Sequence, residues 1–108
     1  MEIKRLEVQE ITVYQVNGEI NISTSPDLKK QFEKQPSKKV VVDLKLVTYI
    51  DSSGLATLVE MLKKTRAQGG ALGLAGLSEK VRSLFEITKL DKLFSISASQ
   101  DEAIANIK

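Results

Sequence analysis

Short apolar runs alternate along this chain with longer segments in which apolar residues recur every three or four positions. The short runs are rich in β-branched residues or alternate apolar with polar positions, which is typical of strands. In the longer segments, the spacing predicts helices that pack by one face. The expected strands cover residues 2–8, 11–16, 40–44, 71–75 and 94–96, and the expected helices begin near residues 25, 53, 78 and 99.

Turn-forming residues separate these segments. A tight turn is expected near residues 9–10, and the Asn-Gly pair at residues 17–18 is a strong turn signal. Residues 18–22 leave open a further short strand before the first helix. Proline ends the first helix near residues 36–37, and glycine ends the second within residues 68–70.

The order of the elements indicates an α/β fold. Two or three strands come first, and each later strand is followed by a helix. Such alternation predicts parallel strands joined by helices. We therefore expect a single domain over residues 1–108, with a mixed, mostly parallel β-sheet of about four to five strands and about four α-helices.

The segment at residues 51–54 carries the most informative chemistry. It follows a strand and opens a helix, so Ser52 and Ser53 lie next to the unpaired N–H groups of a helix start. A phosphate is stabilised there by those N–H groups and by the helix dipole. Both serines are therefore candidates for reversible phosphorylation. The simpler interpretation is an N-cap, for which Asp and Ser are preferred, and the two interpretations are compatible.

Composition excludes several classes of function. Sixteen Lys+Arg against fourteen Asp+Glu give a formal net charge of +2, and the basic residues are scattered, so no direct nucleic-acid partner is expected. Because the chain has no His and no Cys, a Ser-His-Asp triad, a His-ligated metal site, a thiolate zinc site and a disulfide are all excluded.

Hydropathy bears on the expected location of the protein. No apolar run approaches the roughly 20 residues of a membrane span. Residues 1–5 are not followed by the apolar stretch of a signal peptide. We expect a soluble, cytoplasmic protein without a membrane span.

Several blocks of the sequence together resemble a known family. The blocks comprise residues 17–21, 41–44, 47–55, 68–72 and 77–90, in order and with compatible spacing. Asp-Ser-Ser-Gly-Leu at residues 51–55 alone is a weak match, whereas the blocks together are specific. Over nearly its whole length, the sequence is similar to STAS domains of the anti-sigma factor antagonist family.

The resemblance implies a partner-switching protein and not an enzyme. In that family, the unphosphorylated antagonist binds an anti-sigma factor and thereby releases a sigma factor that directs transcription. The anti-sigma factor is also an ATP-binding serine kinase of the histidine-kinase-like type, and it phosphorylates the serine directly after the aspartate, which corresponds to Ser52. A PP2C-type phosphatase restores the binding form. Metal and ATP belong to these partners, so no cofactor is implied for this chain.

Residues around Ser52 are expected to contribute to partner binding. Asp51 positions Ser52 or shapes the docking surface, unless it is simply a cap. Ser53 adds a hydroxyl contact, although helix-start propensity alone explains it. Gly54 admits a partner's backbone or relieves crowding beneath a neighbouring loop. Glu19 is a surface contact or merely an exposed carboxylate at a strand end.

Asn21 departs from the family pattern, in which Asp is common at this position near the phosphorylation loop. The amide keeps the size and hydrogen-bonding capacity of Asp but removes a charge. If that charge assists phosphorylation, a slow reaction or a divergent kinase is expected. Asn21 is counted among the expected partner-binding residues.

Three alternatives remain open. A STAS module without the serine switch, in a stressosome-type or transporter-associated assembly, has the same fold; Ser52 favours the antagonist, whereas Asn21 slightly favours this alternative. A response-regulator receiver would use Asp51 as phospho-acceptor, but the early strands lack the adjacent acidic pair that binds Mg²⁺. The third alternative is an enzyme that uses Ser52 as its nucleophile. Against it, the chain has no His, no Cys and no Gly-x-Ser-x-Gly turn.

Overall fold

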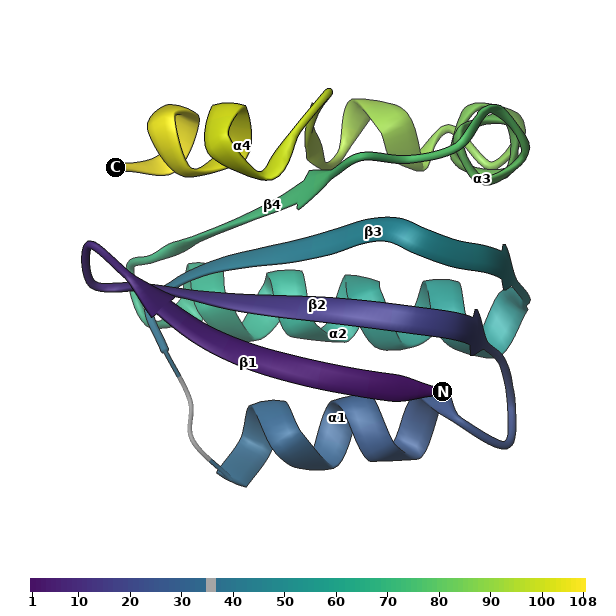
Figure 1. Ribbon diagram of the computed structural model, residues 1–108, viewed down its shortest axis with the longest axis horizontal. Helices are drawn as coiled ribbons and strands as arrows, with labels where there is room; N and C mark the ends of the chain where they lie inside the picture. The colour runs from purple at the N-terminus through teal and green to yellow at the C-terminus, as the bar shows by residue number, and fades with distance from the viewer. Residues whose placement is uncertain (35–36) are drawn as a thin grey trace.

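The computed structural model describes residues 1–34 and 37–108, which form a five-stranded sheet flanked by helices (Figure 1). The strands are β1 (Glu2–Val8), β2 (Ile11–Ile20), β3 (Lys39–Ile50), β4 (Ala71–Ala75) and β5 (Ser95–Ser97). The helices are α1 (Ser25–Lys34), α2 (Ser52–Ala67), α3 (Glu79–Ile87) and α4 (Gln100–Ile107), with a short 3-10 helix at Leu90–Lys92. The strands lie in chain order; β1 is antiparallel to β2 and the later neighbours are parallel. The predicted fold class is confirmed.

Apolar side chains pack on both faces of the sheet, as β3 illustrates. Successive residues of a strand point to opposite faces. Val40 and Val42 belong to the larger core cluster, together with buried residues of α1, α2 and α3. Val41 belongs to a smaller cluster with Ile104 of α4. The helices α1 and α2 therefore cover one face, and α4 covers part of the other (Figure 1). Within the described residues, every helix is too short or too polar to cross a membrane.

The strand β2 continues through the turn predicted at residues 17–18, so that prediction is wrong. Its pairing with β3 shifts register twice between Gln15 and Glu19, and Gly18 has a φ of +108°. Asn-Gly is typical of turns because both residues tolerate positive φ, and a β-bulge uses the same freedom inside a strand. The further short strand considered there is part of β2, which ends at Ile20.

The strand β3 is also longer than the predicted strand at residues 40–44, because it runs on to Ile50. Val47 and Ile50 are buried in the larger cluster, so this extension of the strand contributes residues to the core. Asp51 therefore follows the strand directly. The bulges in β2 and the length of β3 together bring the ends of both strands to the same edge of the sheet.

The remaining boundaries agree closely with the prediction. The strand at residues 71–75 forms as expected, and α1 begins at Ser25 and ends at Lys34. The tight turn between β1 and β2 contains Gln9 and Glu10, both with positive φ. Residue 36, part of the predicted helix stop, lies outside the described residues.

Candidate phosphorylation and partner-binding site

The candidate site lies at the edge of the sheet where β2 and β3 end together. Glu19 pairs with Tyr49, and Ile20 pairs with Ile50. The Asp51 N–H then donates to the Ile20 carbonyl at 3.1 Å. The loop after β2 and the start of α2 therefore lie side by side, at the carboxyl ends of the strands where ligand sites of parallel α/β sheets occur.

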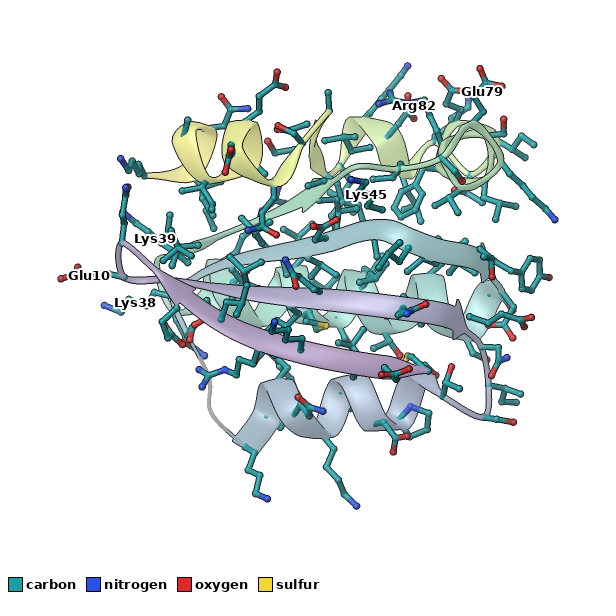
Figure 2. The ribbon with its side chains drawn as sticks, viewed as in Figure 1. Glu10, Lys38, Lys39, Lys45, Glu79 and Arg82 are labelled. Carbon is teal, nitrogen blue, oxygen red and sulfur yellow. The ribbon has the colours of Figure 1, made fainter. Side chains whose placement is uncertain are left out.

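The adjacent lysines at residues 38–39 and 63–64 lie on separate parts of the described chain. Figure 2 shows Lys38 and Lys39 at the far end of the sheet, near Glu10 in the turn between β1 and β2. Lys64 is paired with Glu33 at 2.8 Å, between α2 and α1. The scattered basic positions in the sequence are thus scattered in space as well.

Asp51 caps α2 and also holds the neighbouring loop. Its Oδ1 accepts a hydrogen bond from the Gly54 N–H at 2.9 Å, as an N-cap does. Its Oδ2 accepts from the Ile22 N–H at 3.0 Å, across 29 positions of the chain. The capping interpretation is confirmed, and the second bond fixes the loop after β2 against the helix start. Both carboxylate oxygens thus bind backbone groups, which is unfavourable for the phospho-acceptor role that a receiver would require.

Replacing Asp51 with alanine is expected to lower the free energy of unfolding by about 2 to 3 kcal/mol, since a cap contributes about 1 kcal/mol and a second bond to a carboxylate a similar amount or more. Urea unfolding followed by circular dichroism measures this loss. Ser78→Ala is the matched control, because Ser78 caps α3 with one bond, to the Val81 N–H at 3.2 Å. A loss for Asp51→Ala no larger than the control's would contradict the second role.

Of the two candidate serines, Ser52 is the more accessible. Ser52 is the first residue of α2 and is exposed, whereas Ser53 is half-buried. N–H groups in the first turn of a helix have no partner within the helix, and Asp51 engages that of Gly54. A phosphoryl group on Ser52 would therefore lie at a helix start that favours negative charge, with open solvent on its other side.

Asn21 builds the turn that follows β2. Its Oδ1 accepts from the N–H groups of Ser23 at 2.9 Å and Thr24 at 3.1 Å. Its own N–H donates to the Thr24 hydroxyl at 2.8 Å. Its Nδ2 donates to the Glu19 carboxylate at 3.2 Å. An aspartate here would keep the accepted bonds but would lose the bond donated by Nδ2. It would also place a second carboxylate beside Glu19, so asparagine suits its neighbours in this chain better than aspartate does.

Gly54 is required by the packing of α2 on the strand ends. A Cβ at this position would lie 2.4 Å from the Ile20 carbonyl oxygen and 2.8 Å from Ile50 Cγ2. Both distances are shorter than real Cβ contacts allow, and Gly54 is buried. Crowding within the fold thus explains the glycine, and its contact with a partner stays a prediction.

Comparison with known proteins decides the family. A model of the STAS domain matches residues 2–103. The chain belongs to the STAS domain family. Its relatives include the anti-sigma-B factor antagonist of Listeria monocytogenes, which is 36% identical, with 98% of this chain and 95% of the relative covered. The anti-sigma-B factor antagonist of Bacillus subtilis is also 36% identical, with 83% of this chain and 86% of the relative covered.

Solved structures agree with this membership. The crystal structure of a Thermotoga maritima protein assigned as an anti-sigma factor antagonist superposes with a TM-score of 0.91. The two sequences are 28% identical, and the match covers 97% of this chain and 93% of the other. The STAS resemblance recognised from the sequence is thereby confirmed.

This STAS domain brings the six predicted site residues to one edge of the sheet. Glu19 lies near the end of β2, and Asn21 lies in the loop that follows this strand. Asp51 is the N-cap of α2, and the other three residues form the first turn of that helix. Their contact with a partner stays a prediction. Glu19 and Ser52 are exposed, Asn21, Asp51 and Ser53 are half-buried, and Gly54 is buried.

Two exposed apolar residues of this STAS domain were missed by the sequence reasoning. Ile22 lies in the loop after β2, and Tyr49 lies near the end of β3, with the Lys80 ammonium 5.8 Å from the centre of its ring. A single apolar residue between two polar ones in a turn was the available signal for Ile22. No signal in the sequence marked Tyr49 as exposed, because an aromatic residue near a strand end more often belongs to the core.

Proposed function

We propose that this protein is an anti-sigma factor antagonist that acts in the cytoplasm, as a binding protein and not as an enzyme. It binds an anti-sigma factor and thereby releases a sigma factor. The relatives named anti-sigma-B factor antagonist, which cover most of the chain, support this role. The observation that carries the proposal is the exposed Ser52 at the capped start of α2, at the position expected for the regulatory serine.

We further propose that the bound anti-sigma factor is an ATP-dependent serine kinase of the histidine-kinase-like type, which ends the interaction by phosphorylating Ser52. The Ser52 oxygen forms a bond to the γ-phosphorus, the bond from that phosphorus to ADP breaks, and the hydroxyl proton leaves to a base or to water. ATP and the metal come with the kinase. A PP2C-type phosphatase hydrolyses the phosphoserine and restores the hydroxyl.

The N-terminus of α2 suits a phosphoserine. Phosphorylation adds about −1.5 to −2 charges at neutral pH. The helix dipole and the first-turn N–H groups favour that charge, so the fold has no need to rearrange. The charge acts instead on the partner, through repulsion and through the cost of desolvating the phosphate in a contact surface.

A phosphorylation assay tests the proposed switch residue. Each histidine-kinase-like anti-sigma factor of the source genome is purified and incubated with this protein and labelled ATP. We expect one of them to label the wild type and Ser53→Ala, and to leave Ser52→Ala at background, with mass spectrometry placing the phosphate on Ser52. Label that persists in Ser52→Ala, or no labelling by any of these kinases, would contradict the proposal.

Partner capture tests the antagonist role independently of the switch. Immobilised wild-type protein is expected to retain an anti-sigma factor of this type from a lysate of the source organism, identified by mass spectrometry. Recovery of a transporter or a large scaffold in its place would favour the structural STAS module considered from the sequence.

A further inference from the structure

Two exposed apolar side chains belong to the same edge of the sheet as the proposed switch residue. Across the described residues, five large apolar side chains are exposed: Ile22, Leu46, Tyr49, Ile87 and Leu93. Of these, Ile22 is 72% exposed and Tyr49 is 41% exposed, and both belong to the edge of the sheet that carries Ser52. Single exposed apolar residues are ordinary on protein surfaces, and these two differ from such residues in that neighbouring groups hold them in place.

Ile22 is presented on a fixed backbone. Its N–H donates to Asp51 Oδ2 at 3.0 Å, one residue before Ser52. The residues on either side belong to the turn built by Asn21, whose Oδ1 accepts from the Ser23 N–H at 2.9 Å. The exposed side chain of Ile22 is thus carried by a loop that is bonded to the start of α2, and little conformational freedom of its backbone is left to lose when a partner binds.

Tyr49 is held in a similar way. Its backbone pairs with Glu19 in the parallel ladder between β2 and β3, two residues before Asp51. The Lys80 ammonium, from the first turn of α3, lies 5.8 Å from the ring centre, within the range of a cation–π contact. The ring is therefore oriented by a neighbouring element, and a rigid, amphipathic aromatic residue of this kind is a frequent anchor of protein interfaces.

We propose that Ile22 and Tyr49 are the apolar anchors by which the anti-sigma factor recognises this protein, and that Lys80 is a positioning residue for Tyr49. This inference rests on the proposed function, because the anti-sigma factor is the occupant that must cover Ser52. Ile22 is bonded to Asp51, and Tyr49 precedes Asp51 by two residues, so a partner that covers Ser52 at this edge of the sheet also covers both anchors.

The anchors also explain why one phosphate would suffice as a switch. A phosphate at the hydrated rim of an interface keeps its water and costs little. Where apolar side chains exclude water, the same phosphate must be desolvated, which is far more costly. Removal of an anchor is therefore expected to weaken binding and also to reduce the effect of a negative charge at residue 52.

The test compares exposed apolar residues inside and outside the proposed surface. Affinity for the purified anti-sigma factor that labels Ser52 is measured by calorimetry. Ile22→Ala and Tyr49→Ala are each expected to weaken binding by about tenfold or more, and the matched controls Leu46→Ala and Ile87→Ala by less than about twofold. All four residues are exposed, so the unfolding midpoint should stay near that of the wild type.

A double-mutant cycle tests the role of Lys80. Lys80→Gln is expected to weaken binding by a few-fold in the wild type and to have no further effect in the Tyr49→Ala background, because Lys80 acts through the ring. An equal effect in both backgrounds would overturn the positioning role.

Failure of this inference is distinguishable from failure of the proposed function. If the wild type binds and Ser52→Asp does not, while Ile22→Ala and Tyr49→Ala bind like the controls, the anchors are wrong and the switch stands. If the wild type itself binds none of the purified anti-sigma factors, both the proposed function and the anchors are overturned.

Discussion

Gly54→Ala is expected to lower the free energy of unfolding by about 2 to 4 kcal/mol, although alanine in a helix normally adds about 1 kcal/mol over glycine. The added Cβ would lie 2.4 Å from the Ile20 carbonyl oxygen, a backbone atom of a paired strand, and 2.8 Å from Ile50 Cγ2. Neither neighbour belongs to a flexible side-chain end. The start of α2 must therefore move away from the sheet, and the Asp51 cap is stretched with it.

Urea unfolding of Gly54→Ala and of a second glycine variant provides the measurement and its control. Gly73 is buried in β4, and a Cβ there would find its nearest neighbours at 3.6 Å, an ordinary contact distance. Gly73→Ala is expected to change the free energy of unfolding by no more than about 1 kcal/mol. Equal stabilities of the two variants would show that the start of α2 can move without a loss in the free energy of unfolding, and that Gly54 serves another purpose.

The sequence predicts most of this fold because its elements are locally encoded. The β-branched run at residues 40–44, the alternating first strands and the apolar spacing of the helices each carry their own signal. Gly18 shows where local reasoning fails. Asn-Gly encodes positive φ, and whether the chain uses it for a hairpin turn or for a bulge depends on the neighbouring strand β3, which lies far away in the sequence.

The candidate site was predictable as a segment but not as a surface. Residues 51–54 indicate a capped helix start after a strand by their types alone. The bond from the Ile22 N–H to Asp51 joins residues 29 positions apart, and the contact of Lys80 with Tyr49 joins two different elements. Such pairs depend on strand order and register, which periodicity does not specify. The exposure of Ile22 follows from the same long-range geometry.

The structure also gives a physical context for the amide at Asn21. In this chain, the Nδ2 group binds the Glu19 carboxylate, so an acidic residue at position 21 would meet a like charge. Within this pair, the amide and Glu19 fit each other, and Glu19 keeps one negative charge at the edge of the sheet. The departure from the family pattern is thus accommodated by a neighbouring residue, and it does not remove the turn that presents Ile22.

Phosphorylation of Ser52 is expected to weaken binding of the anti-sigma factor by about a hundredfold or more, a loss of about 3 kcal/mol, while changing the free energy of unfolding by less than about 1 kcal/mol. The two effects separate because the phosphate lies outside the core. Ser52 is exposed at the start of α2, where the helix dipole favours its charge, so the fold is little affected. A partner that covers this edge of the sheet must either desolvate the phosphate or dissociate.

The measurement pairs calorimetric affinity with urea unfolding for the phosphorylated protein and for Ser52→Asp, with Ser52→Ala as the uncharged control. Ser52→Ala is expected to bind within a few-fold of the wild type, because a small hydroxyl contributes little to a large interface. Ser52→Asp is expected to lose most of the binding with an unchanged unfolding midpoint. If Ser52→Asp unfolds much more readily than Ser52→Ala, the charge acts through the fold. Switching would then work by local unfolding of α2 and not by repulsion at a fixed surface.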